Sequence, residues 1–522
     1  MKRITFLLIA STFIATSCGT LDKTSETSKP EEPANVLDYA NTITEEELKE
    51  MLYVYASDEF EGRETGEPGQ KKAVNYLKEQ YLAMDIPSPI SKDDYFQEVP
   101  LTKQKAAKVN LSLNGEELEN FTDFLVLGSV ESQNLDISEV VYAGYGIDTE
   151  AYSDYKNLDV KDKVVLVKVG EPKDADGNYV TTGEKTDTKW SVGRQSLRTK
   201  RDAAIENGAK ALIHYNPALL AMYSPYYKQM AESGKAGRMS LKGNDNRMVN
   251  MLVGDKIVES FFPELDTTDE HQTVKLNLKV DIEAQNENVD SENVVAFIKG
   301  SEKPDEIIVV SAHLDHEGIK DGKIYNGADD DGSGTIAILE IAEAFKAAEK
   351  DGYSPKRSIL FLHVTGEEKG LLGSKHYSDN DPIFPLENTV ANLNIDMIGR
   401  TDPKREGDRN YVYLIGSDKL STELHEISED VNSKFTNITL DYKYNDENDP
   451  NRFYYRSDHY NFAKNNIPVI FYFNGTHDDY HQPSDTVEKI QYDLLENRTR
   501  LVFHTAWELA NREERIIVDK AE

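Results

Sequence analysis

The chain has 522 residues, 38% of them hydrophobic, and carries a formal net charge of −35 at pH 7. This length is too great for one hydrophobic core, so we expect two or three domains. The negative charge argues against nucleic acid or an anionic membrane surface as a partner, because phosphate groups would repel the protein.

The N-terminus has the pattern of an export signal. Lys2 and Arg3 precede a short apolar stretch, and small residues then lead to Cys18, the only cysteine of the chain. This order is typical of a secretory signal peptide, and its ending resembles the lipobox of bacterial lipoproteins, in which the cysteine carries the lipid. We therefore expect residues 1–18 to be a lipoprotein signal peptide. The exported protein would be membrane-anchored at the periplasmic face or the cell surface, through Cys18 alone. The alternative is an ordinary signal peptide with an incidental cysteine.

The next elements lead into the first folded region. Residues 19–42 are predicted to be a flexible tether, because residues 19–35 are rich in Thr, Ser, Glu, Lys and Pro. Ordered structure is expected to begin near Ile43, where Thr44 precedes three glutamates and can cap a helix. A second helix is expected at about residues 70–83. We assign residues 43–100 to the N-terminal part of the main domain.

Residues 101–285 have a different texture and predict an inserted β-rich domain. Apolar or alternating stretches are separated by turn residues, as in strands, and one helical pattern at residues 199–207 ends at Gly208. The strands are expected at residues 109–113, 140–143, 164–169, 211–214 and 274–280.

In residues 286–515 strand and helix patterns alternate. Alternation of this kind predicts an α/β fold with a mainly parallel sheet flanked by helices. Strands are expected at residues 294–298, 307–312, 359–364, 390–395, 411–415 and 469–473, and helices at residues 333–347, 422–431, 459–464 and 492–511.

Residue types that bind metals follow four of these strands. They are His313 and Asp315, then Glu367 and Glu368, then Asp396, and finally His477 and His481. Three consecutive aspartates, residues 329–331, also precede the first helix. Open α/β sheets bind ligands beyond the carboxyl ends of their strands, so we expect these residues to converge in one crevice.

The residue types indicate a catalytic metal site. The single cysteine excludes intrachain disulfides and thiolate zinc sites. Imidazoles with carboxylates suit zinc or a related divalent ion in a site with open positions. Such a metal makes water acidic, and a nearby glutamate can take the proton and pass it to a leaving amine. A carboxylate close to a ligating imidazole, as in His313 and Asp315, usually orients the ring.

Five segments together resemble the di-zinc exopeptidases of peptidase family M28. They occur in the family's order and at suitable spacing, and residues 56–66 look like the segment that precedes the core in the same family. The resemblance covers residues 44–100 and 290–512 and implies the zinc-exopeptidase fold, which is phosphorylase/hydrolase-like. The five segments are residues 313–315, 327–334, 366–374, 396–397 and 480–486.

The resemblance also implies the roles of the site residues. Two zinc ions are expected, one held by His313 and Asp396 and the other by Glu368 and His481. Asp330 would bridge the two ions, and a cis peptide bond would follow it.

The same resemblance assigns the proton transfer. Glu367 would be the general base and acid, and Asp315 would orient His313. Further candidates to line the pocket are His316, His459 and His477.

The middle region has its own resemblance. Residues 140–146, 161–167 and 203–211 are similar to a protease-associated (PA) domain, which several family members carry as an insertion. Such a domain is expected to shape access of the substrate rather than to supply ligands. Residues 222–250 match no pattern.

The sequence thus predicts a zinc-dependent exopeptidase that acts on peptides, with an aminopeptidase as the leading form. Cleavage from the amino or the carboxyl end both stay open. One alternative is a glutaminyl cyclase-like transferase with one zinc, against which both His313 and Asp396 count. The other is a non-catalytic receptor-like relative, against which Glu367 and the complete ligand set count.

Overall fold

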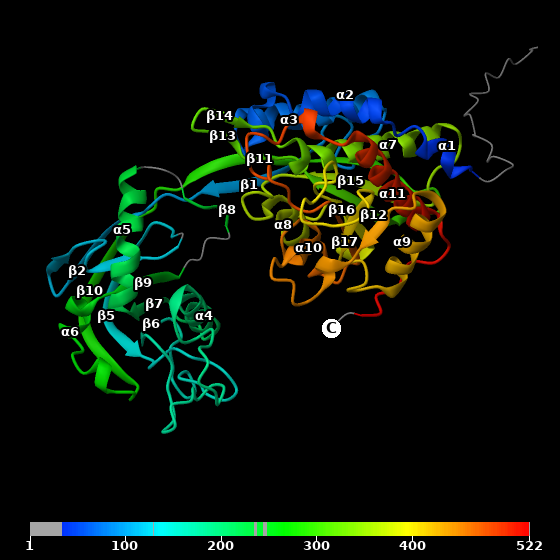
Figure 1. The fold of residues 1–522 in the computed structure, drawn as a ribbon. Helices are drawn as coiled ribbons and strands as arrows, with labels where there is room; N and C mark the ends of the chain where they lie inside the picture. Colours follow the sequence, from blue (N-terminus) through cyan, green and yellow to red (C-terminus); the bar gives the residue numbers. More distant parts are fainter. Residues whose placement is uncertain (1–33, 129, 234–236, 244–247, 521–522) are drawn as a thin grey trace, which may run out of the picture.

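The computed structural model describes residues 34–128, 130–233, 237–243 and 248–520, which form two lobes (Figure 1). The large lobe contains a nine-stranded sheet and the small lobe an eight-stranded sheet. Two long paired strands, β1 (Phe96–Lys103) and β11 (Glu287–Ile298), carry the chain out of the large lobe and back into it. The small lobe therefore lies between residues 103 and 287, close to the predicted insertion at 101–285.

The tether prediction is wrong at its C-terminal end. Helix α1 spans Val36–Ala40, where Tyr39 and Ala40 are buried. The Tyr39 ring stacks on Trp507 of the last helix, with ring centroids 5.8 Å apart. A polar composition averaged over residues 19–42 hides this short apolar anchor. The predicted signal peptide, with Cys18, lies outside the described residues.

The two predicted N-terminal helices are confirmed. Helix α2 spans Glu45–Tyr55, and the Thr44 hydroxyl oxygen accepts a hydrogen bond from the Glu47 N–H at its start. Such a cap satisfies one of the free N–H groups of the first turn. Helix α3 spans Pro68–Ala83 and begins with a proline, whose missing N–H costs nothing at this position.

The large sheet is parallel only at its centre. The strand order is β18-β17-β19-β16-β12-β15-β11-β1-β8. Adjacent strands from β19 to β15 are parallel, as are β17 and β18, whereas β17·β19 and all pairs from β15 to β8 are antiparallel. Strands β1 and β11 must be antiparallel because one leaves the lobe and the other returns to it. The prediction of a mainly parallel sheet is therefore corrected to a mixed sheet. Its remaining strands are β8 (Met239–Leu241), β12 (Lys303–His313), β15 (Arg357–Val364), β16 (Thr389–Ile395), β17 (Tyr411–Ile415), β18 (Thr439–Asp441) and β19 (Val469–Phe473).

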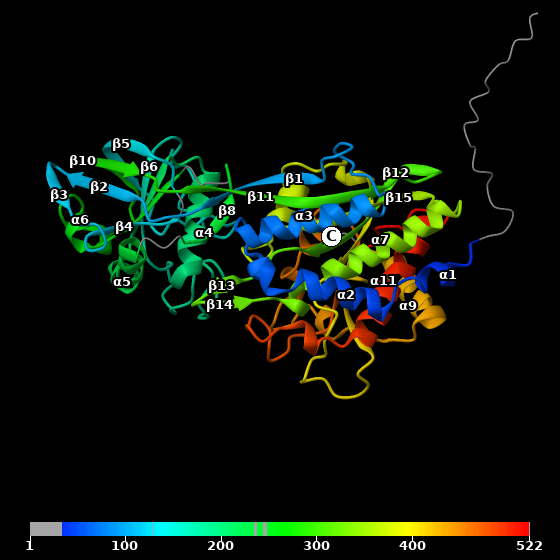
Figure 2. The same ribbon diagram turned by 90° about the horizontal axis from the view of Figure 1, so that it is seen from above.

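Helices cover both faces of this sheet, as predicted. One face packs against the helices named above together with α7 (Gly334–Lys350), α9 (Thr422–Phe435) and α11 (Tyr492–Asn511) (Figure 2). The other face packs against α8 (Leu372–Asp379) and α10 (His459–Ala463). Burial on both faces explains why the central strands are apolar along their whole length.

The small lobe is built on a mixed sheet in the order β3-β2-β10-β5-β6-β7-β9-β4. The unassigned segment 222–250 contributes the end of α5 (Pro217–Ser233), strand β8, which pairs with β1 of the large lobe, and the start of β9. The other helices of the lobe are α4 (Gly193–Glu206) and α6 (Asp255–Glu259). Its strands are β2 (Lys108–Leu113), β3 (Glu116–Leu118), β4 (Phe124–Val126), β5 (Gln133–Tyr142), β6 (Val164–Lys168), β7 (Ala211–Tyr215), β9 (Val249–Val253) and β10 (Gln272–Glu283).

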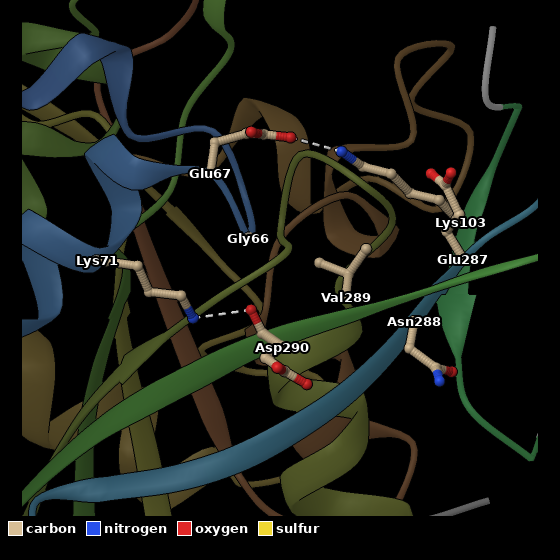
Figure 3. Close-up of a pocket in the computed structure, with 8 residues that line it drawn as sticks. All are labelled: Gly66, Glu67, Lys71, Lys103, Glu287, Asn288, Val289 and Asp290. Atoms are coloured by element: carbon tan, nitrogen blue, oxygen red, sulfur yellow. Dashed lines mark hydrogen bonds and ion pairs between the residues drawn. The ribbon is translucent and has the colours of Figure 1, made fainter.

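A cavity of about 440 Å³ lies where the two lobes join (Figure 3). It is lined by the start of α3, the end of β1 and residues 287–290 of β11. An ion pair of 2.6 Å joins Lys103 to Glu67, and the Lys71 ammonium donates a hydrogen bond of 2.8 Å to the Asp290 carbonyl. None of the predicted site residues lines this cavity. Among the described residues, no helix is both long and apolar enough to span a bilayer.

Candidate metal centre

The sheet brings the predicted ligands to its carboxyl edge. His313 is the last residue of β12, Glu368 follows β15, and Asp396 follows β16 directly. Asp330 lies in a short helical turn, Ala328–Ser333, that leads into α7. His481 arrives on the loop after β19. Because neighbouring parallel strands end at the same edge, side chains far apart in the sequence meet there.

Asp330 lies between two groups of side chains. Its Oδ1 is 3.2 Å from the Nε2 of His313, and that Nε2 is 3.7 Å from the Oδ1 of Asp396. Its Oδ2 is 3.1 Å from the Nε2 of His481, which is also 3.1 Å from the Oε1 of Glu368. Each oxygen of one carboxylate thus faces a different imidazole. All five predicted ligands come together in this arrangement.

His316 joins the second group, a position that the sequence analysis assigned only to the pocket wall. Its Nδ1 lies 2.9 Å from the Oε1 of Glu368 and 3.8 Å from the Oδ2 of Asp330. The signal was present in the sequence, since His316 follows His313 by three residues in the same loop. The other two candidates lie elsewhere. The Nε2 of His477 contacts Asp329 at 3.1 Å, and the buried ring of His459 stacks on Phe471.

The residue types and spacing at this centre fit bound zinc. Within the described part of the chain, the polar atoms buried without a hydrogen-bond partner include His313 Nε2, both ring nitrogens of His316, Asp330 Oδ2 and Glu368 Oε1. Buried polar atoms are rarely left without partners. Zinc bonds of 2.0–2.2 Å place the ligand atoms of a tetrahedron about 3.3 Å apart, which is close to the separations above. Carboxylate and imidazole groups are also the donors that zinc accepts.

The charged groups of the centre shift one another's pKa values. Burial alone would lower the pKa of His313, but Asp330 and Asp396 raise it well above its usual range. Burial likewise opposes ionisation of Glu368, yet His316 and His481 lower its pKa to about 2. The carboxylates Asp330 and Glu368 raise the pKa of His481 to about 10. Glu368 is therefore held in the ionised form that a cation requires.

Glu367 has the opposite environment. Burial raises its pKa well above the usual range, and the neighbouring carboxylates of Glu368, Asp396 and Asp458 raise it further. The pKa values of the two adjacent glutamates are thus shifted in opposite directions.

The structure corrects the expected role of Asp315. The Nδ1 of His313 lies 3.0 Å from the backbone carbonyl oxygen of Asp315 but 4.0 Å from its carboxylate. The carboxylate instead accepts hydrogen bonds from the Glu367 N–H at 3.1 Å and from the Thr65 hydroxyl at 2.7 Å. The backbone of Asp315 orients the ring, and its side chain holds the segment that carries Glu367.

The two other aspartates of the 329–331 run brace the loop. Asp331 accepts hydrogen bonds from the N–H groups of Gly334 and Met397. Asp329 accepts one from the N–H of Gly399. The peptide bond between Asp330 and Asp331 is cis, as the resemblance predicted. Of the three, Asp330 is the one that faces the imidazoles of His313 and His481.

Comparisons with known proteins agree with this geometry. Residues 293–506 match peptidase family M28. The chain is 26% identical over 308 residues to aminopeptidase YwaD of Bacillus subtilis, covering 56% of this chain and 61% of that protein. It is 27% identical over 353 residues to probable leucine aminopeptidase 2 of Aspergillus oryzae, covering 68% of this chain and 58% of that protein. The chain thus spans less than two thirds of the length of either relative.

A solved structure is also similar. An aminopeptidase from Aneurinibacillus sp. strain AM-1 has a TM-score of 0.45 and 20% identity, with 93% of this chain and 98% of that chain covered. Residues 293–506 thus resemble peptidase family M28, and both sequence relatives are described as aminopeptidases.

Proposed function

We propose that this protein is a zinc-dependent aminopeptidase that uses two zinc ions. The observation that carries the proposal is the position of Asp330, whose two oxygens face separate imidazole groups. Two-metal hydrolases hold their ions about 3.5–4 Å apart, so one carboxylate must be shared between them. His313 and Asp396 are proposed to hold one ion, and Glu368 and His481 the other. His316 stands beside the second pair.

The chemistry follows from the charges around Glu367. Zinc, when bound, supplies Lewis acidity toward a peptide carbonyl and toward water. Glu367 is proposed to take a proton from the attacking water and to give it to the leaving amine. Burial and the neighbouring carboxylates raise the pKa of Glu367, which favours its proton-carrying form. Asp315 holds the Glu367 backbone by accepting its N–H.

A test separates this function from its alternatives. The protein is loaded with zinc and offered dipeptides with a free amino terminus, the same dipeptides with an acetylated amino terminus, and dipeptides with an amidated carboxyl terminus. We expect cleavage of the first and third sets only, and loss of activity after removal of zinc by a chelator. Cleavage of the acetylated set without cleavage of the amidated set would contradict an aminopeptidase.

Metal content tests the mechanism itself. Two zinc ions per chain are expected, whereas a glutaminyl cyclase-like transferase would bind one. A receptor-like protein would bind metal without hydrolysing any peptide.

The small lobe is proposed to be a PA-like domain that limits access of the substrate. Its support is the resemblance in sequence and the core of parallel strands β5, β6, β7 and β9. The expected effect of this lobe is on substrate length. Long peptides should therefore be cleaved with a higher KM than dipeptides.

Export with a lipid anchor at Cys18 is also proposed, on the sequence of residues 1–18. Cys18→Ala should abolish incorporation of labelled palmitate in a bacterial host and release the protein from the membrane fraction. Unchanged labelling would contradict the anchor.

A further inference from the structure

The segment before α3 is hydrogen-bonded to the loop that carries His313. The Tyr55 hydroxyl and the Arg63 Nε both donate to the carbonyl of Leu314, at 2.9 Å and 3.2 Å. The N–H of His316 donates to the carbonyl of Arg63 at 3.3 Å. Residues 55–65 are therefore part of the wall of the metal centre, although Thr65 and His313 lie 248 positions apart in the sequence.

Arg63 fixes this segment in place. The side chain is fully buried, and its guanidinium also donates to the carbonyls of Asn326 at 2.6 Å and Gly327 at 2.9 Å. Those carbonyls lie at the start of the loop that holds Asp330. A buried guanidinium is costly unless its donors are satisfied. Here the donors of the guanidinium are satisfied by the carbonyls of Leu314, Asn326 and Gly327. Arg63 thereby links the segment after His313 to the segment before Asp330.

Thr65 extends this contact to the reacting groups. Its hydroxyl donates to Asp315 Oδ2 at 2.7 Å, and Asp315 Oδ1 accepts the N–H of Glu367 at 3.1 Å. Thr65 and Asp315 are both fully buried. The methyl group of Thr65 also packs near Gly366, since a Cβ built on that glycine would lie 3.7 Å from Thr65 Cγ2. One side chain thus supports both the backbone and the hydrogen-bond acceptor next to Glu367.

We propose that Thr65 is a positioning residue for Glu367, acting through the carboxylate of Asp315. This inference rests on the proposed function for its catalytic part. Without the Thr65 hydroxyl, Asp315 is free to rotate, and the backbone of Glu367 loses a fixed acceptor. The position of the Glu367 carboxylate then becomes less well defined, which slows proton transfer more than it weakens binding of the peptide.

The test compares three variants that keep the volume of the side chain or nearly so. Thr65→Val removes the hydroxyl and keeps the shape, and Thr65→Ser restores the hydroxyl. Thr505→Val removes a buried threonine hydroxyl in α11, which donates to the Leu501 carbonyl of its own helix at 2.9 Å and lies in no part of the centre. For each variant we measure kcat, KM, zinc content and hydrogen exchange of the peptide that contains Glu367, the last in the metal-free protein.

Thr65→Val should lower kcat about 10- to 100-fold, as is usual for groups that support a ligand or base, and KM should change less than about twofold. Amide exchange at Glu367 should be faster, with zinc content unchanged. Thr65→Ser and Thr505→Val should behave as the wild type.

Two results would overturn the role of Thr65. One is wild-type kcat and exchange in Thr65→Val, and the other is equal impairment of Thr65→Ser, which would assign the effect to packing. An inactive wild type would instead overturn the proposed function, while the exchange measurement would still decide the link to Glu367.

Discussion

Both lobes bury charged side chains beside parallel strands, but the partners of those charges differ. In the small lobe, Glu171 accepts hydrogen bonds from the hydroxyls of Thr181, Thr188 and Ser191. Lys200 is buried in the same lobe and donates to the carbonyls of Lys168 at 3.0 Å and Gly170 at 2.8 Å. Each of these side chains is hydrogen-bonded to neutral dipoles of the protein itself.

At the centre of the large lobe the charged groups face one another. Buried atoms of His313, Asp330 and Glu368 lie there, and their nearest polar neighbours are imidazoles and carboxylates of the same centre rather than neutral dipoles. A buried charge is therefore a weak sign of a site, because protein dipoles can satisfy it. Convergence of several acceptors on one point is a stronger sign, because only a cation satisfies all of them.

The largest expected difference between the lobes comes from removing one buried carboxylate in each. Asp330→Ala should lower the affinity for both zinc ions at least 100-fold and reduce peptide hydrolysis to background, because one carboxylate serves both ions. Glu171→Ala should leave zinc binding unchanged and destabilise the small lobe by about 1–3 kcal/mol, since three hydroxyls lose their acceptor. Zinc titration and urea unfolding measure the two effects. Loss of zinc from Glu171→Ala would remove the distinction.

A second prediction concerns proton transfer by Glu367, which can be removed without changing any of the proposed zinc ligands. Glu367→Gln should lower kcat by about two to four powers of ten, because an amide cannot accept the proton of water. The zinc content and the thermal midpoint should stay within error of the wild type. Steady-state kinetics with a dipeptide and metal analysis check this result. Near-normal turnover would exclude Glu367 from proton transfer.

The sequence predicted the metal centre better than it predicted the sheet around it. His313, Asp330, Glu368, Asp396 and His481 meet because each follows an apolar strand or opens a helix, and strand ends are visible in the order of residues. The antiparallel half of the large sheet was not visible. Its pairings follow from a long excursion of the chain, which local periodicity does not encode.

Contacts between residues far apart in the sequence explain the other differences between the predicted and the observed structure. The carboxylate of Asp315 was expected to orient His313, but Thr65 and the Glu367 backbone bind it first. Helix α1 was hidden in a polar stretch because its anchor, Trp507, lies at the other end of the chain. Residue types and spacing thus define which groups are available, and packing decides which partner each of them takes.

A third prediction concerns the small lobe, whose unfolding free energy should depend on pH through the buried Lys200. Burial lowers the pKa of Lys200 from 10.5 to about 7, although Asp154 and Glu171 act in the opposite direction. Between these two values the unfolded chain binds more protons than the folded chain, so stability rises with pH. Relative to Lys200→Met, the wild type should gain about 2 kcal/mol in unfolding free energy between pH 7 and pH 9.

Urea unfolding followed by tryptophan fluorescence can measure this gain in the small lobe alone. Trp190 lies in that lobe, and Trp507→Phe in both proteins removes the second fluorophore. The zinc content should not change with Lys200→Met at either pH. A difference between the two proteins that is the same at pH 7 and pH 9 would contradict the assignment to Lys200.

The smallest expected effect concerns Asp396 in the large lobe, where one carboxylate oxygen accepts a hydrogen bond and the other is left for a metal ion. A chain of buried hydrogen bonds runs from Asn392 through Ser311 and Asn394 to the hydroxyl of Ser457, which donates to Asp396 Oδ2 at 2.7 Å. Asp396 Oδ1 is left facing His313. Both carboxylate oxygens of Glu171, by contrast, accept hydrogen bonds from hydroxyl groups.

Ser457→Ala should therefore weaken one zinc ion and not the other. Without its donor, Asp396 can turn either oxygen toward the metal or away from it, and a loss of about tenfold in affinity, or about 1.4 kcal/mol, is expected at the ion held with His313. The ion held by Glu368 and His481 should keep its affinity, because the hydrogen bonds of Ser457 go to Asn394 and Asp396 and to neither of these two ligands.

The two zinc affinities can be measured by competition with a chromophoric chelator. The matched control is Ser417→Ala, which removes a buried hydroxyl beside His425. Equal weakening of both ions would show that the hydroxyl supports the centre as a whole rather than Asp396 alone.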